Sequence, residues 1–179
     1  MKNKALFLDR DGVVNVDHGY VHRIEDFHFV DGIFDLCRRA RTANYQIIIV
    51  TNQSGVARGL FDSKDLEMLH QWMTSVFKKE GVDILDIFYC PHHPEYSLAE
   101  SDQNCSCRKP KPGMLEAACA KHGIDMECSI MIGDKLSDRQ AALAAGVGRF
   151  LLFSAANLNA IKNDAPDDER VAQLCNVVI

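Results

Sequence analysis

The sequence lacks the features that mark the large non-globular classes of protein. No apolar run approaches the length of a membrane span, and no internal repeat or low-complexity tract is present. The start, MKNKALFLDRDG, passes straight into a short strand-like run and lacks the longer apolar stretch of a secretory signal. We therefore expect a cytoplasmic protein with no membrane partner.

An excess of positive charge is missing as well. The 179 residues carry a formal net charge of -5, whereas broad binding to nucleic acid needs basic patches. Nucleic acid is therefore not an expected partner, and local cations must hold any phosphate ester that binds. A composition of 47% hydrophobic and 25% charged residues is typical of a globular protein. We expect a single domain over residues 1–179.

A disulfide framework is not expected either. Seven cysteines make an odd set, and a chain without a secretion signal keeps its thiols reduced. Four of them stand singly in apolar or helical segments, as small core side chains do: Cys37, Cys119, Cys128 and Cys175. The other three lie close together in one polar stretch.

Short apolar runs alternate with helical patterns along the chain. This alternation predicts an α/β fold, a doubly wound (Rossmann-like) parallel sheet with helices on both faces. The predicted strands are 5–8, 46–50, 84–89, 129–132, 150–153 and 177–179, and the predicted helices are 32–44, 63–80, 114–122 and 137–145. Residues 16–31 and 91–111 are expected to be loops, and 157–170 a loosely packed loop or helix. Ligands of such sheets bind beyond the carboxyl ends of the strands.

Two carboxylates follow the first predicted strand. Asp9 and Asp11 stand two residues apart in LFLDRDGV, so both can project toward one side, and Gly12 gives the turn freedom. One carboxylate can attack phosphorus while the other carries a proton to and from the leaving oxygen. Attack on a phosphate dianion needs a divalent cation, and hard oxygen ligands suit Mg²⁺. A polar turn after a strand is the alternative.

Three later segments also place polar groups where strands end or helices begin. The second strand runs into TNQSG, whose hydroxyl and amide can donate to phosphate, although an ordinary strand-end turn fits too. The segment CRKPKPGM carries three cations before a helix start, either an anion site or a solvated turn. In IMIGDKLSD, Asp134 can hold a metal and Lys135 an anion, while Asp138 can merely cap or enter the next helix. Because a doubly wound sheet brings strand ends together, the four segments indicate one site.

A Cys/His group lies in and beside the second loop. Cys90, His92, Cys105 and Cys107 provide three thiolates and an imidazole, the Cys₃His set of a structural zinc site without an open position. The spacing fits His93 as well, and we choose His92. Three buried cysteines beside a surface histidine pair are the alternative, but cysteines in a polar loop are hard to bury. Zinc would tie down a loop at about 90–107 that delivers the next two cations.

In this order the four segments resemble the motifs of the haloacid dehalogenase (HAD) superfamily. The resemblance implies that Asp9 is the nucleophile and Asp11 the general acid and base. It also implies that Thr51 and Lys109 steady the transferring phosphoryl group. Mg²⁺ would be held by Asp9, the carbonyl of Asp11 and Asp134. An acid at position 11 points to hydrolysis of a phosphate ester.

Residues 5–153 look more closely like the D-glycero-D-manno-heptose 1,7-bisphosphate 7-phosphatases. The segments that carry this likeness are LDRDGVVNVDHGYV, VTNQSGVARG, YCPHH, CSCRKPKPGM and GDKLSD. The likeness implies a HAD-like fold without a large cap domain, and hydrolysis of a sugar bisphosphate at its 7-phosphate through an aspartyl-phosphate, in heptose activation for lipopolysaccharide core biosynthesis. The residues that it places at the substrate are Asp17, His18, Gly19, Tyr20, Thr51, Asn52, Gln53, Ser54, Arg108, Lys109 and Lys135.

Two other functions remain open. Histidinol-phosphate phosphatase shares the motifs and a similar zinc loop, but the DHGY segment and the Arg108–Lys109 pair favour a substrate with a second phosphate. A non-catalytic zinc- and phosphate-binding module is disfavoured, because it needs no nucleophile and this chain keeps all three motif aspartates. We expect a monomer whose partner is a small-molecule sugar bisphosphate.

Overall fold

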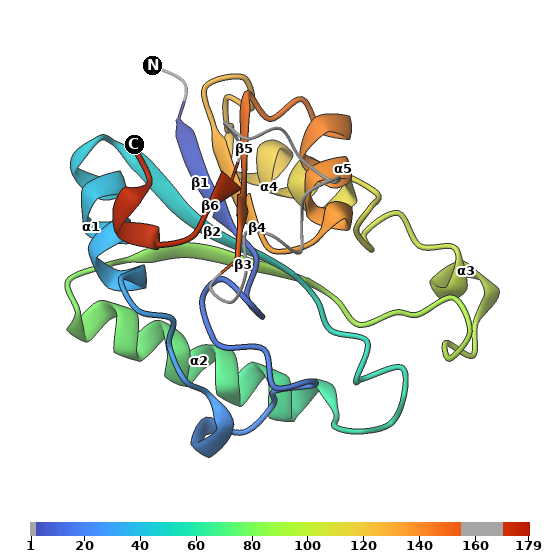
Figure 1. The fold of residues 1–179 in the computed structure, drawn as a ribbon. Coiled ribbons are helices and arrows are strands. Elements are labelled where there is room, and N and C mark those ends of the chain that lie inside the picture. The colour runs from blue at the N-terminus through green and yellow to red at the C-terminus, as the bar shows by residue number, and fades with distance from the viewer. Residues whose placement is uncertain (1–2, 155–169) are drawn as a thin grey trace.

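The computed structural model describes residues 3–154 and 170–179. Six parallel strands form one sheet in the order β3-β2-β1-β4-β5-β6, and helices cover both faces (Figure 1). The strands are β1 Lys4–Leu8, β2 Tyr45–Asn52, β3 Ile84–Cys90, β4 Ile130–Gly133, β5 Arg149–Phe153 and β6 Arg170–Val171. The α-helices are α1 Ile33–Thr42, α2 Ser63–Lys79, α3 Glu100–Gln103, α4 Gly113–His122 and α5 Leu136–Ala144, and short 3₁₀ turns are η1 Ile24–Asp26 and η3 Leu174–Asn176. Within these residues no helix is both long and apolar enough to cross a membrane.

Successive residues of the central strand β1 face opposite sides of the sheet. Leu6 and Leu8 join the core that α1 and α2 cover, whereas Ala5 and Phe7 join the core under α4 and α5. All four side chains are fully buried. Burial on both faces explains why the strands are almost continuously apolar in sequence, as in other parallel sheets. The predicted fold class is therefore confirmed.

The helix ends follow local chemistry that is visible in the sequence. The side chain of Asp62 accepts hydrogen bonds from the backbone N–H groups of Lys64 and Asp65, and the side chain of Asp65 accepts one from the backbone N–H of Asp62, which completes a capping box. At the other end of the sheet, α4 stops at Gly123, whose φ of 61° is a left-handed conformation that favours glycine. The four predicted helices lie within two residues of the observed ones.

The predicted terminal strand is wrong. Residues 177–179 are irregular, and the sixth strand is instead the short β6, which pairs with β5. The apolar run at the C-terminus packs without joining a ladder: Val177 is buried, and its carbonyl accepts a hydrogen bond of 2.6 Å from Arg39 Nη1. Of the predicted loose segment 157–170, residues 157–169 lie outside the described part, and Arg170 begins β6.

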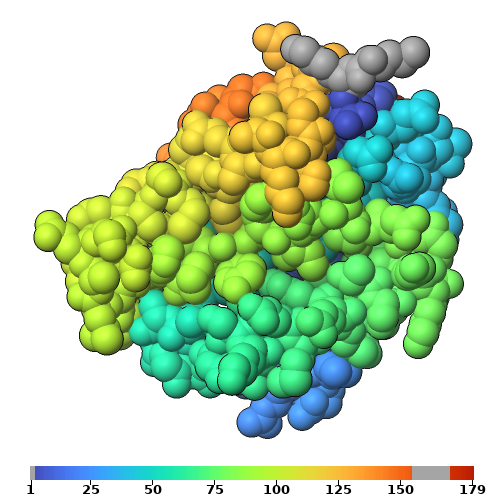
Figure 2. All heavy atoms as spheres, turned by 180° about the vertical axis from the view of Figure 1, so that it is seen from behind, coloured from blue at the N-terminus to red at the C-terminus, as the bar shows by residue number. Residues whose placement is uncertain are grey.

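The carboxyl ends of all six parallel strands lie along one edge of the sheet, and the two long connections start there. The first connection, 16–31, contains η1, and the second, 91–111, contains α3. The second connection projects from the body of the molecule between β3 and α4 (Figures 1 and 2). Its two ends return to the sheet edge, so the sequence that follows it is delivered to the carboxyl ends of the strands.

Candidate active site and metal centre

A cavity of about 630 Å³ lies beyond the carboxyl ends of β1, β2 and β4. It brings together most of the residues expected at the substrate, although they come from four separate segments of the chain. Its lining includes Asp9, Asp11, Asp17, Gly19, Tyr20, Thr51, Asn52, Gln53, Ser54, Arg108, Lys109, Lys135 and Asp138. His18 is not part of that lining, and its ring instead lies edge-on to His28 at 5.5 Å.

Asp9 and Lys109 form a buried ion pair at the floor of this cavity. Lys109 Nζ lies 2.8 Å from Asp9 Oδ1 and 2.6 Å from Asp138 Oδ1, and it also donates to the carbonyl of Val50. Burial, together with the charges of Asp138 and Asp134, raises the pKa of Asp9, while Lys109 opposes the rise. Burial works against the charge of Lys109, but Asp9 and Asp138 outweigh it and raise its pKa. Lys109 is thus a fixed cation beside Asp9.

Three carboxylates form a group with the geometry of a cation site. Oxygens of Asp9, Asp134 and Asp138 all lie within 4.8 Å of one another. Asp134 Oδ1 is buried and has no hydrogen-bond partner, as expected of an oxygen that serves a metal. A Cβ on Gly12 would lie 2.3 Å from Asp134 Oδ2, so only glycine lets the first motif approach this carboxylate. This set of hard oxygen donors fits Mg²⁺.

The carboxylate of Asp11 is held by donors on several sides. Arg10 Nη2 donates to both of its oxygens at 2.9 and 2.8 Å. Asn15 Nδ2 donates at 3.0 Å and Gln53 Nε2 at 2.8 Å. Gln53 Nε2 also donates to Thr51 Oγ1, which leaves the hydroxyl hydrogen of Thr51 to point elsewhere. Asp11 therefore has one fixed orientation, two residues from Asp9.

The loop that carries the basic residues is fastened to the end of β2 by a reciprocal pair of hydrogen bonds. Asn52 Nδ2 donates to the carbonyl of Lys109, and the backbone N–H of Lys109 donates to Asn52 Oδ1, both at 3.0 Å. Arg108 Nη1 donates to the carbonyl of His92 at 3.1 Å. These contacts fix both cations relative to the sheet.

Asp17 and Lys135 line another side of the cavity. Lys135 Nζ lies 3.2 Å from Asp17 Oδ2 and 3.5 Å from Asp134 Oδ2. Burial opposes the charge of Lys135, but Asp134, Asp9 and Asp17 raise its pKa. Asp17 Oδ1 in turn accepts from the backbone N–H of Gly19, and Tyr20 follows with a φ of 52°. The expected substrate loop is thus joined to the fourth motif through one ion pair.

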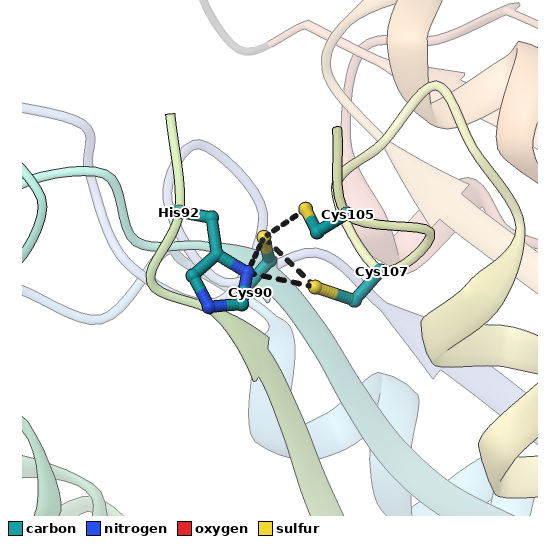
Figure 3. Close-up of side chains that lie close together, drawn as sticks. All are labelled: Cys90, His92, Cys105 and Cys107. Carbon is teal, nitrogen blue, oxygen red and sulfur yellow. Dashed lines mark hydrogen bonds between the residues drawn. The ribbon is translucent and has the colours of Figure 1, made fainter. Parts of the chain in front are cut away.

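The Cys/His group is a compact cluster formed by the last residue of β3 and the second connection. Figure 3 shows the side chains of Cys90, His92, Cys105 and Cys107 pointing toward one another. Cys90 Sγ lies 3.1 Å from Cys107 Sγ, 3.6 Å from Cys105 Sγ and 3.8 Å from His92 Nδ1. A tetrahedral ion with Zn–S bonds of about 2.3 Å separates neighbouring ligand atoms by roughly 3.8 Å, so the cluster has the dimensions of such a site.

The structure gathers His92 into this cluster and leaves His93 outside it. His92 turns Nδ1 to the thiols, and its Nε2 lies 3.5 Å from Asp102 Oδ1, the usual outer carboxylate of a metal-bound imidazole. His93 Nε2 lies 3.1 Å from Arg58 Nη2, and its Nδ1 accepts from the backbone of Glu95.

Several residues of the site were missed by sequence reasoning. Asp138, which the sequence assigned only to a cap or a helix start, is buried and paired with Lys109. Its position four residues after Asp134, in the first turn of α5, was a usable signal, because that turn faces the strand end. The contact between Arg10 and His70 could not be predicted from the sequence, because 60 residues separate them.

Comparison with known proteins gives one consistent result. A family profile described as HAD-hydrolase-like matches residues 106–169. A D-glycero-beta-D-manno-heptose-1,7-bisphosphate 7-phosphatase of Yersinia pestis is 51% identical over 148 residues, 83% of this chain and 79% of that protein. A protein of the same name from Vibrio cholerae serotype O1 is 44% identical over 179 residues, 100% of this chain and 92% of the relative.

A solved structure agrees with these relatives. The D,D-heptose 1,7-bisphosphate phosphatase from B. bronchiseptica, complexed with magnesium and phosphate, superposes with a TM-score of 0.82 at 32% identity. The match covers 96% of this chain and 93% of that one.

Proposed function

We propose that this chain, which belongs to the family of D-glycero-beta-D-manno-heptose-1,7-bisphosphate 7-phosphatases within the HAD-like hydrolases, hydrolyses the 7-phosphate of that sugar bisphosphate. One observation carries the proposal. Asp9 lies buried at the end of β1, 2.8 Å from the cation Lys109 and beside two further carboxylates, with Asp11 on the same turn. A nucleophile, a phosphate-binding cation, a metal site and an acid therefore meet at one cavity.

In the proposed reaction the carboxylate of Asp9 attacks phosphorus, and the bond from phosphorus to the sugar oxygen breaks. Asp11 gives its proton to that departing oxygen. In the second half, Asp11 takes a proton from water as the water attacks phosphorus, and the bond to Asp9 breaks. Phosphate leaves, and both carboxylates return to their starting states.

Lys109 and Thr51 are proposed to hold the oxygens of the phosphoryl group during this transfer. Lys109 is buried and charged, and the hydroxyl hydrogen of Thr51 is free to donate because Gln53 already donates to its oxygen. Asp9, Asp134 and the carbonyl of Asp11 would hold Mg²⁺, and Asp138 adds a third carboxylate to that group. Bound Mg²⁺ would offset the negative charge of carboxylate and phosphate.

The second phosphate of the substrate is assigned to Arg108, with Lys135 and the loop 17–20 facing the sugar. Arg108 uses one Nη on the carbonyl of His92, so the rest of its guanidinium remains available on the cavity side. Arginine can grip a phosphate through two parallel hydrogen bonds, which lysine cannot. The product would serve heptose activation for lipopolysaccharide core biosynthesis.

We further propose that the Cys/His cluster binds Zn²⁺ as a structural ion. Its four ligand atoms leave no open position, and the chain passes directly from Cys107 to Arg108 and Lys109. A site of three thiolates requires reduced cysteines, which supports placement in the cytoplasm. We also infer that residues 1–179 form one domain and work as a monomer, since one continuous sheet in the described residues positions every segment that lines the cavity.

The test is phosphate release from a panel of esters with Mg²⁺ present. We expect the specificity constant for heptose 1,7-bisphosphate to exceed that for histidinol phosphate by at least about a hundredfold, the discrimination available to a site with dedicated polar contacts. Asp9→Asn should fold normally and release no phosphate, because its amide cannot act as nucleophile. A preference for histidinol phosphate would contradict the substrate, and undiminished turnover by Asp9→Asn would contradict the mechanism.

A further inference from the structure

The largest fully buried side chain in the described part of the protein is a charged one, Arg10. It stands between the two carboxylates of the first motif in sequence, yet it is not among the residues that line the cavity. Buried guanidinium groups are rare and must be paired. Its partners therefore show what it does.

The guanidinium of Arg10 joins three separate segments. Nη2 donates to both oxygens of Asp11 and, at 2.6 Å, to the carbonyl of Val21, which directly follows the substrate loop 17–20. Nη1 lies 3.3 Å from His70 Nε2 on α2. Nε also donates to Asp11 Oδ1 at 3.3 Å. Asp11 and Val21 therefore hold Nε and Nη2 of the guanidinium, and His70 holds the remaining nitrogen, Nη1.

The ring of His70 accepts a hydrogen bond from Arg10 at this position. Arginine has no acceptor, so Nε2 of His70 must supply the lone pair and Nδ1 must carry the hydrogen. Burial, reinforced by the charge of Arg10, lowers the pKa of His70 to about 3, so the ring stays neutral. The ring also lies edge-on to Tyr89 of β3 at 5.8 Å, which limits its own rotation.

We propose that His70 is a positioning residue for Asp11, acting through Arg10. By holding Nη1, the one guanidinium nitrogen that Asp11 does not engage, His70 limits the motion of Arg10, and Arg10 in turn holds both oxygens of Asp11. The inference rests on the proposed function, because it assumes that Asp11 is the acid. It adds a residue that never touches substrate or metal and whose loss affects protonation of the leaving group.

The experiment compares two esters that differ in their need for protonation. Heptose 1,7-bisphosphate has an alcohol leaving group that must be protonated by an acid. The leaving group of 4-nitrophenyl phosphate is 4-nitrophenolate, which departs with little help from an acid. His70→Leu removes the acceptor, while His70→Gln keeps an acceptor near the place of Nε2. We expect His70→Leu to lower kcat for the sugar ester about tenfold, a part of the 10²–10⁴ that acid–base catalysis supplies, and to change the aryl ester less than about threefold. KM should stay unchanged, and His70→Gln should restore most of kcat.

Two controls separate this role from general damage. Leu69→Ala, on the same helix and buried outside the network, should slow both esters alike or neither. Asp11→Asn shows the selectivity expected when the acid is lost altogether. If Asp11→Asn slows both esters equally, the proposed function fails. If Asp11→Asn is selective but His70→Leu is not, only the positioning role of His70 fails.

Two further outcomes, a slow His70→Gln enzyme and a His70→Leu variant that does not fold, also have a defined meaning for the proposal. A His70→Gln enzyme as slow as His70→Leu would overturn the proposal, because an acceptor would then make no difference. Should His70→Leu not fold, His70→Asn replaces it, since its shorter amide does not reach Arg10. The same selective loss of the sugar ester in that variant supports the proposal, and its absence overturns it.

Discussion

The pair of Lys109 and Asp138 permits a quantitative test of what holds Lys109 in the cavity. Both side chains are almost completely buried, 3% and 1% exposed, and their charged atoms lie 2.6 Å apart. The other oxygen of Asp138 accepts from the backbone N–H groups of Asp134 and Lys135. In Asp138→Asn the amide oxygen can keep those backbone contacts, and its NH₂ group then faces the ammonium of Lys109, donor against donor.

The size of the loss follows from what Lys109 retains. It keeps Asp9 at 2.8 Å and the carbonyl of Val50 at 2.9 Å, so its charge is not left unpaired. The full effect of breaking a buried pair, about 3–5 kcal/mol, therefore does not apply. One charge-assisted hydrogen bond contributes about 1.5–3 kcal/mol, and the relieved repulsion between carboxylates offsets a part of it. We expect a loss of about 2 kcal/mol in the free energy of unfolding.

The assay is urea denaturation at neutral pH, with phosphate release measured on the same samples. Asp35→Asn is the matched control, because Asp35 and Arg39 form an ion pair that is 57% and 34% exposed. That control should change stability by less than about 0.5 kcal/mol. We also expect kcat of Asp138→Asn to fall about tenfold, less than removal of a transition-state donor, because Lys109 is displaced and not lost. Equal stability of the two variants would refute the reasoning.

Three further changes test other parts of the site. Gly12→Ala should raise the Mg²⁺ concentration needed for half-maximal activity by about tenfold or more, because the new Cβ would lie 2.3 Å from Asp134 Oδ2. Gly123→Ala is the control: Gly123 also has a positive φ, but no atom lies within 4 Å of the added Cβ, so that Mg²⁺ concentration should not change. Cys107→Ser should lose zinc, measured by elemental analysis, and should lose activity that added Mg²⁺ does not restore. The control Cys128→Ser, at an exposed cysteine, should retain both zinc and activity. Zinc loss with full activity would show that the loop does not place Arg108 and Lys109. Arg108→Ala should lower the specificity constant for the bisphosphate at least about tenfold more than that for a simple monophosphate ester, since a charged hydrogen bond to the second phosphate is lost, and equal losses would assign Arg108 to the chemistry or the fold.

Local patterns in the sequence were sufficient for most of the architecture. Apolar runs buried on both faces marked five of the six strands, and capping residues such as Asp62 marked the helix ends. The order of the four motifs was sufficient to gather the site, because parallel strands end at one edge of the sheet. The failure at 177–179 has the same origin, since an apolar run records burial but not whether its backbone joins a ladder.

The sequence by itself therefore determined five of the six strands, the four longer helices, most of the residues that line the cavity and the three cysteines of the Cys/His cluster. Only the tertiary structure decided that His92 and not His93 completes that cluster, that Asp138 pairs with Lys109, and that His70 meets Arg10. These contacts join side chains from different elements, and their partners are chosen by the packing of helices against the sheet. Periodicity and capping act within a few residues along the chain, whereas such contacts depend on which buried charges and lone pairs happen to face each other across the core.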